Sequence, residues 1–216
     1  QPILLPPLPT PPPRSDPTMP TRDFITVVSG LPRSGTSLMM QMLHAGGIEA
    51  VTDQERKPDA DNPRGYFEFE RVKKIKTDKA WLPDARGKQV KMVHILLLDL
   101  PTNPLPPGIA GYRVVFMRRH LEEVVKSQSV MLERHGKTGA ALPPERLMAM
   151  YKQQIDQVLA HCAKSPAFQL MELSYNDLMA DPTAAADRLN DFLGGGLDQQ
   201  AMVSAVDPTL YRNKKA

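Results

Sequence analysis

The chain has 216 residues, of which 41% are hydrophobic and 24% are charged, a composition typical of a soluble globular protein. The formal net charge of +3 is too small to indicate a nucleic-acid-binding protein, but it suits a protein that binds a small anion. No apolar run is long enough for a transmembrane segment. A single cysteine, Cys162, cannot form an intrachain disulfide, so we expect a cytoplasmic protein whose thiol is a buried helix residue.

The beginning of the chain is rich in proline. Residues 1–20 contain nine of the 22 prolines. Proline lacks a backbone N–H donor and favours the extended polyproline conformation. We therefore predict a disordered leader over residues 1–21, followed by a single folded domain over residues 22–216.

Strands and helices alternate after this leader. Apolar runs predict strands over residues 24–29, 90–95, 113–117 and 168–173. Helical spacing predicts helices over residues 36–45, 67–77, 121–135 and 145–164. Asp181 and Pro182 predict the start of a last helix, which the glycines from Gly194 onward end. Strands separated by helices indicate an α/β fold, in which helices cover both faces of a parallel sheet.

The turn between the first strand and the first helix reads "SGLPRSGTSLM". Gly30 and Gly35 are spaced as in a phosphate-binding loop, where free backbone N–H groups and the helix dipole attract an anion. Arg33 adds a guanidinium, and Ser34, Thr36 and Ser37 add hydroxyl donors. Thr36 stands where a nucleoside-triphosphate loop carries lysine, which argues against ATP or GTP.

The segment "LPRSGTSLM" resembles the loop of sulfotransferases that use 3′-phosphoadenosine 5′-phosphosulfate (PAPS). In that family a Pro-Lys/Arg-Ser-Gly-Thr-Ser/Thr loop holds the 5′-phosphosulfate. The resemblance implies a P-loop NTPase-like sulfotransferase fold, PAPS as donor and no metal. The residues that it assigns to this part of the donor are Leu31, Pro32, Arg33, Ser34, Gly35, Thr36 and Ser37.

Three further segments bear on donor binding. "VVFMRRHLEEVVKSQ" resembles the family's site for the 3′-phosphate, with Arg119 after a strand and Ser127 eight residues later; Arg118 is the neighbouring alternative. "LSYNDLMADP" resembles a family segment that implies a place for Tyr175 near the nucleotide. The Arg-Lys-Gly loop that many members carry near the C-terminus is absent, and Arg212 in "LYRNKK" is the candidate in its place.

Arg33 is the candidate that stabilises the negative charge on the sulfuryl group during its transfer. Two residues compete as the general base that accepts a proton from the acceptor. Glu68 lies in "NPRGYFEFE", which resembles an Asn-Pro-x-Gly-Tyr-x-Glu segment of bacterial members. His94 lies in "VKMVHILLLDLP". In many family members a Lys-x-His motif at a comparable strand end supplies the catalytic histidine, but here two residues separate Lys91 from His94. That extra residue can turn a strand side chain to the opposite face. We rank Glu68 first, His94 second and Asp53 third.

The predicted reaction is therefore transfer of a sulfuryl group from PAPS to a hydroxyl or amine. Carbohydrate, lipid, peptide and small-molecule acceptors all remain open, and no nucleic acid is expected as a partner. One alternative is a nucleotide kinase or other NTPase, since "ILLLD" resembles a strand that ends on a magnesium-binding Asp99. Another is a non-catalytic nucleotide-binding or adaptor protein, with the proline-rich leader as its recognition segment.

Overall fold

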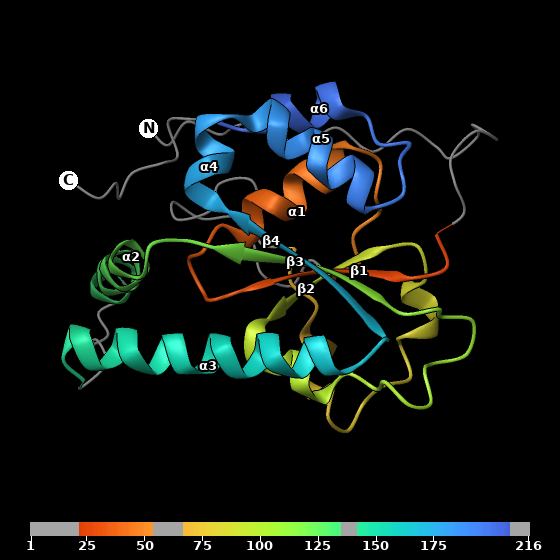
Figure 1. Ribbon diagram of the computed structural model, residues 1–216, viewed down its shortest axis with the longest axis horizontal. Helices are drawn as coiled ribbons and strands as arrows, with labels where there is room; N and C mark the ends of the chain where they lie inside the picture. The colour runs from red at the N-terminus through yellow and green to blue at the C-terminus, as the bar shows by residue number, and fades with distance from the viewer. Residues whose placement is uncertain (1–21, 54–66, 135–141, 208–216) are drawn as a thin grey trace.

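The computed structural model describes residues 22–53, 67–134 and 142–207. The predicted leader and Arg212 lie outside these ranges. A four-stranded parallel sheet runs through the middle of the molecule in the order β2-β1-β3-β4 (Figure 1). Its strands are β1 (Ile25–Gly30), β2 (Gln89–Val93), β3 (Tyr112–Arg118) and β4 (Phe168–Ser174). The α/β fold class with a parallel sheet is thereby confirmed.

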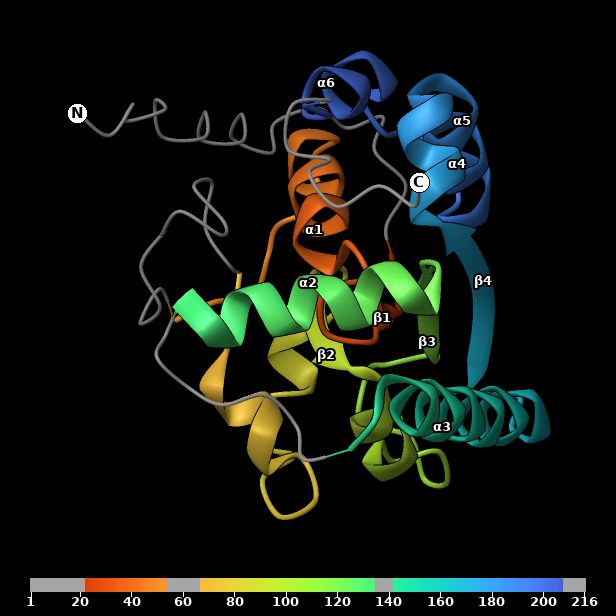
Figure 2. The same cartoon turned by 90° about the vertical axis from the view of Figure 1, so that its left-hand side faces the viewer.

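Helices cover both faces of this sheet (Figure 1). One face carries α1 (Thr36–Ala45), α4 (Tyr175–Ala180), α5 (Pro182–Phe192) and α6 (Gln199–Ser204). The other face carries α3 (Pro144–Lys164). The remaining helix, α2 (Leu121–Arg134), lies across the carboxyl ends of the strands (Figure 2). No helix within the described ranges is long and apolar enough to cross a membrane.

Alternating side chains divide the hydrophobic core into two layers. Ile25 and Val27 of β1 join the layer beneath α3, whereas Val28 joins the layer beneath α1. Buried side chains on both faces explain why the strands read as continuous apolar runs. Cys162 is buried on α3 as predicted, and this burial raises the pKa of its thiol to about 11.

One predicted element is wrong in type, and another is wrong only in where it ends. Residues 67–69 are irregular, with a left-handed φ of 51° at Phe67, and lead into the short 3₁₀ helix η1 (Glu70–Lys74) in place of the predicted longer helix. The predicted strand over 90–95 stops at Val93, and a second 3₁₀ helix, η3 (His94–Asp99), follows. A short apolar run does not distinguish a strand from a helical turn. The strand ending on Asp99, which favoured an NTPase, is therefore absent.

Short helices near the C-terminus were not predicted, because six residues give too short a pattern. Ser174 caps α4 by accepting a hydrogen bond from the N–H of Asp177, and Asp198 caps α6 in the same way. The predicted cap of α5 is confirmed. The Asp181 carboxylate accepts from the N–H of Ala184 at 3.0 Å, and Pro182 is the first helical residue.

The contribution of the Asp181 cap to the free energy of unfolding can be tested by mutation. Asp181→Ala should lower the free energy of unfolding by about 1 kcal/mol, because the first turn of α5 loses its side-chain acceptor. Asp187→Ala is the matched control, since Asp187 is an exposed residue inside the same helix. It should cost nothing or stabilise slightly, because alanine has the higher helix propensity. Urea denaturation of both variants measures the difference, and equal stabilities would contradict the role of the cap.

Candidate functional site

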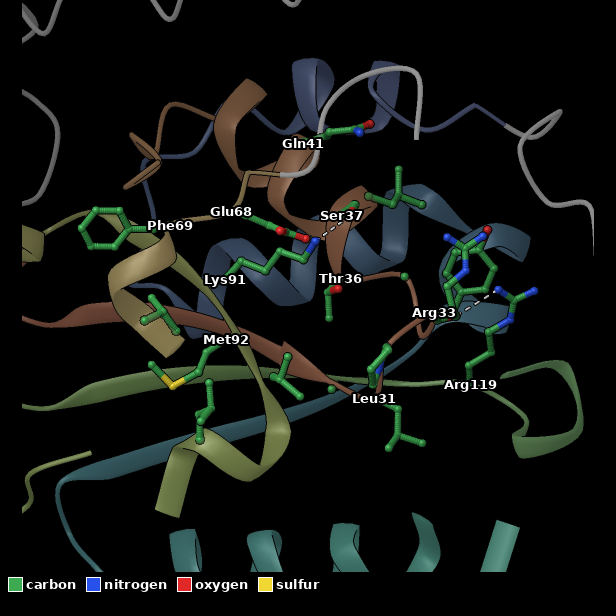
Figure 3. A pocket seen from close by; sticks show the side chains of 18 of the residues that line it. Leu31, Arg33, Thr36, Ser37, Gln41, Glu68, Phe69, Lys91, Met92 and Arg119 are labelled. Carbon is green, nitrogen blue, oxygen red and sulfur yellow. Dashed lines mark hydrogen bonds between the residues drawn. The ribbon is translucent and has the colours of Figure 1, made fainter. Parts of the chain in front are cut away.

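A cavity of about 450 Å³ opens at the carboxyl ends of the strands (Figure 3). Every strand contributes to its wall at or just after its last residue: Gly30 of β1, Val93 of β2, Arg119 after β3 and Tyr175 after β4. Open parallel sheets bind their ligands at this edge. The wall also contains the predicted loop residues Leu31, Pro32, Arg33, Gly35, Thr36 and Ser37.

The loop between β1 and α1 requires glycine at both ends. At Gly35, φ is 99°, and an added Cβ would lie 2.3 Å from Cδ2 of Tyr175. At Gly30, φ is 149°, and an added Cβ would lie 2.7 Å from the carbonyl oxygen of Met117. The chain thus passes closer to its neighbours than any side chain permits. This tight path turns the loop around the start of α1.

Arg33 is held in an unusual backbone conformation. Its φ is 72°, in the left-handed region that a non-glycine residue rarely occupies. Hydrogen bonds from the α2 side fix it: Arg119 Nη1 donates to the carbonyl of Arg33 at 3.2 Å, and Gln128 Nε2 donates to the carbonyl of Pro32 at 3.2 Å. Strained residues of this kind cluster at functional sites.

The predicted 5′-phosphosulfate loop and the predicted 3′-phosphate segment contact each other through their side chains. Arg33 Nε donates to Ser127 Oγ at 3.0 Å, although 94 residues separate them in the sequence. The Arg119 guanidinium lies 4.6 Å from the centre of the Tyr175 ring. Arg118 points elsewhere and pairs with Glu172 at an exposed position. The structure therefore brings Arg33, Arg119, Ser127 and Tyr175 together.

The start of α1 leaves donors for an anion. Gly35 is the N-cap residue and has no side chain to occupy the first N–H groups of the helix. The hydroxyl of Ser34 is buried and has no hydrogen-bond partner within the described part of the chain. Thr36 and Ser37 line the cavity from the first turn. Such a helix start is suited to a phosphate or sulfate group.

Lys91 is a site residue that the sequence did not reveal. It lies on β2 opposite Val28, and its Nζ donates to Ser37 Oγ at 2.9 Å. Its side chain points into the cavity between Ser37 and Glu68 (Figure 3). An ammonium thus reaches the loop from a neighbouring strand, close to Thr36, where an NTP-binding loop would carry its own lysine. The only sequence signal was its position three residues before His94.

The two base candidates lie in different environments. Glu68 lines the cavity, and its carboxylate points toward the Lys91 ammonium (Figure 3). The carbonyl of Glu68 accepts hydrogen bonds from Thr52 Oγ1 and from the N–H of Asp53. Asp53 Oδ2 accepts from the N–H of Glu70 at 2.6 Å, so Asp53 helps to fix this segment.

His94 is absent from the cavity wall. It is 4% exposed, and its Nε2 lies 3.1 Å from Oε1 of Gln154 on α3. Burial lowers the pKa of its imidazole. Lys91 lies on the α1 face of the sheet and His94 packs beneath the opposite face. His94 also lies past the end of β2, as the first residue of η3, so strand alternation alone does not set its direction.

The cavity has a cationic end and an apolar end. Arg33 and Arg119 lie at one end, while Phe69 and Met92 lie at the other, with Glu68 and the Lys91 ammonium between them (Figure 3). Further apolar wall residues are Val72, Val93, Leu96 and Met131. This arrangement suits an anionic group beside an uncharged one. Among the described residues, no group of three or more His, Cys, Asp or Glu side chains is arranged to hold a metal ion.

Residues 111–199 match the sequence model of the sulfotransferase family. This stretch includes Arg119, Ser127 and Tyr175, so the predicted family resemblance is confirmed there. The loop that holds Arg33 lies before it. No curated protein sequence matches the chain.

Several solved structures are similar to the chain at low identity. One is the sulfotransferase domain from the curacin biosynthetic pathway, with 15% identity, a TM-score of 0.48, and coverage of 88% of this chain and 86% of that one. A sulfotransferase from Mycobacterium tuberculosis has 17% identity and a TM-score of 0.49, with coverage of 85% and 71%. Retinol dehydratase in complex with androsterone and the inactive cofactor PAP has 16% identity and a TM-score of 0.46, with coverage of 87% and 64%.

The loop geometry predicts a strong effect of Gly35→Ala. Gly108 is the matched control, because its φ is 76° but an added Cβ would meet nothing within 4 Å. Gly108→Ala should cost only the left-handed backbone, about 1 kcal/mol. Gly35→Ala should cost about 1–3 kcal/mol more, because the Tyr175 ring must shift. Chemical denaturation of both variants measures the difference, and equal losses of stability would show that Tyr175 yields freely.

Proposed function

Starting from the sulfotransferase match over residues 111–199, we propose that this protein is a PAPS-dependent sulfotransferase. It would transfer the sulfuryl group to a hydroxyl or amine of an acceptor and release adenosine 3′,5′-bisphosphate. The single observation that carries the proposal is the hydrogen bond between Arg33 and Ser127, since it joins the loop after β1 to the segment after β3.

Two neighbouring anion subsites fit this donor better than a triphosphate. The start of α1, with Ser34, Thr36 and Ser37, would hold the 5′-phosphosulfate. Arg119 and Ser127 would hold the 3′-phosphate, with the Tyr175 ring packed on the guanidinium. A triphosphate would follow the loop alone, and its usual lysine partner is replaced by Thr36.

The reaction breaks the bond between sulfur and the oxygen of the 5′-phosphate and forms a bond between sulfur and the acceptor oxygen or nitrogen. Like phosphoryl transfer, it depends on positioning and on compensation of the charge on the transferring group. We assign the compensation of that charge to Arg33 and Lys91, which both line the cavity. Glu68 would take the proton from the acceptor hydroxyl, because it is the ranked candidate whose side chain lines the cavity.

The acceptor would occupy the apolar end of the cavity. Phe69, Val72 and Met92 there favour a small molecule with an uncharged skeleton over a long carbohydrate. Glu68 and Lys91 lie between the proposed donor end and the proposed acceptor end of the cavity, which favours a catalytic over a non-catalytic function. The cytoplasmic location and the single domain over residues 22–216 stay predictions.

Ligand binding tests the donor. Adenosine 3′,5′-bisphosphate at a hundred times its dissociation constant should stabilise the fold by about 2.7 kcal/mol. Mg-ATP and adenosine 5′-phosphate should stabilise it less at equal concentration, because neither carries a 3′-phosphate for Arg119 and Ser127. Thermal unfolding with each nucleotide measures the order. Stabilisation by Mg-ATP alone would overturn the proposal.

Turnover of labelled PAPS tests the base. With donor and acceptor saturating, Glu68→Gln should lower kcat by about a hundredfold or more, because the amide cannot accept the proton. His94→Ala is the comparison. It should lower stability by removing a buried side chain, but it should leave kcat within about threefold of the wild type. Full turnover in Glu68→Gln together with a large loss in His94→Ala would make His94 the base.

A further inference from the structure

Glu123 is a buried carboxylate that none of these steps uses. It lies on α2 with 2% of its side chain exposed, and its partner Arg119 is 8% exposed. Oε2 of Glu123 accepts from Nε of Arg119 at 2.8 Å. The adjacent arginine offers a contrast, because Arg118 pairs with Glu172 at 2.6 Å while both side chains remain over 40% exposed, at 42% and 44%.

Both oxygens of Glu123 accept hydrogen bonds. Oε1 accepts from Nδ2 of Asn176 at 3.2 Å. Asn176 follows Tyr175 at the start of α4, and the Tyr175 ring lies against the Arg119 guanidinium. Glu123 therefore holds Arg119 directly and also holds the segment that packs on its face. The plane of the guanidinium is fixed at the cavity wall.

Burial of the Arg119–Glu123 ion pair costs free energy, so its presence points to a role other than stability. Removing two charges from water is expensive, and a buried ion pair is often no more stabilising than an apolar pair of the same size. An exposed pair such as Arg118 with Glu172 carries little of that cost. What a buried and fully hydrogen-bonded pair provides is a fixed geometry, and bidentate recognition of a phosphate by arginine depends on such geometry.

We propose that Glu123 is a positioning residue for the 3′-phosphate subsite, acting through Arg119. The inference rests on the proposed function, because it assumes that Arg119 binds that phosphate. Two effects of Glu123 oppose each other: its charge weakens the attraction of Arg119 for an anion, and its hydrogen bonds orient the guanidinium. Orientation prevails, since a pre-organised donor binds without rearrangement.

The experiment compares two nucleotides by calorimetry on the full chain. Adenosine 3′,5′-bisphosphate and adenosine 5′-phosphate differ only in the 3′-phosphate, so the ratio of their dissociation constants isolates that subsite. In Glu123→Gln the advantage of the bisphosphate should fall by about tenfold. The affinity for adenosine 5′-phosphate should stay within about threefold of the wild type, because the loop that starts α1 is unchanged. A general loss of structure would instead weaken both nucleotides.

Glu172→Gln is the control, since it removes the same charge from the partner of the neighbouring arginine. It should leave the ratio unchanged. An unchanged or larger bisphosphate advantage in Glu123→Gln would overturn the inference. A wild-type protein that binds the two nucleotides equally would overturn the 3′-phosphate subsite itself, and this is visible before any variant is compared. If Glu123→Gln does not fold, Glu123→Asp gives the same test, because its shorter carboxylate keeps the charge but loses the reach.

Discussion

Hydrogen bonds from one short segment, residues 119–128, hold the loop after β1 against α2. Arg119 and Gln128 bind consecutive carbonyls of that loop, and Ser127 accepts from the side chain of Arg33. With those carbonyls turned toward α2, the loop keeps a left-handed residue at Arg33 that an isolated peptide would avoid. The position of both proposed anion subsites depends on this contact, because neither the strand nor the helix alone would bring Arg33 and Arg119 together.

Lys91 and His94, at the end of β2, lie on opposite sides of the sheet. Lys91 on the α1 face reaches the cavity, whereas His94, just past the strand end, is buried against α3. The same strand end therefore contributes a lysine to the cavity and, just after it, a packing histidine to the core beneath α3. The carboxylate that approaches Lys91 is that of Glu68, from the irregular segment before η1.

Local patterns predicted much of this arrangement. The glycine-bounded loop, the α5 cap and the spacing of eight residues between Arg119 and Ser127 are short-range signals, and each was predicted from one short segment. What the sequence did not reveal depends on contacts between distant segments. Lys91 becomes a site residue only because β2 pairs with β1, and the role of Glu123 becomes visible only when α4 brings Asn176 beside it. The strand predicted over 90–95 runs two residues too far, because a short apolar run fits a strand or a helical turn, and residues 94–99 form a 3₁₀ helix that packs against α3.

The lone cysteine has a practical consequence for studying the cavity. Cys162 is buried within α3, and its raised pKa leaves very little thiolate at neutral pH. Maleimide reagents react through the thiolate, so the native chain would give almost no background labelling. A cysteine introduced at an exposed position near the cavity mouth, such as Val93, could then carry a fluorescent reporter without removal of any native residue.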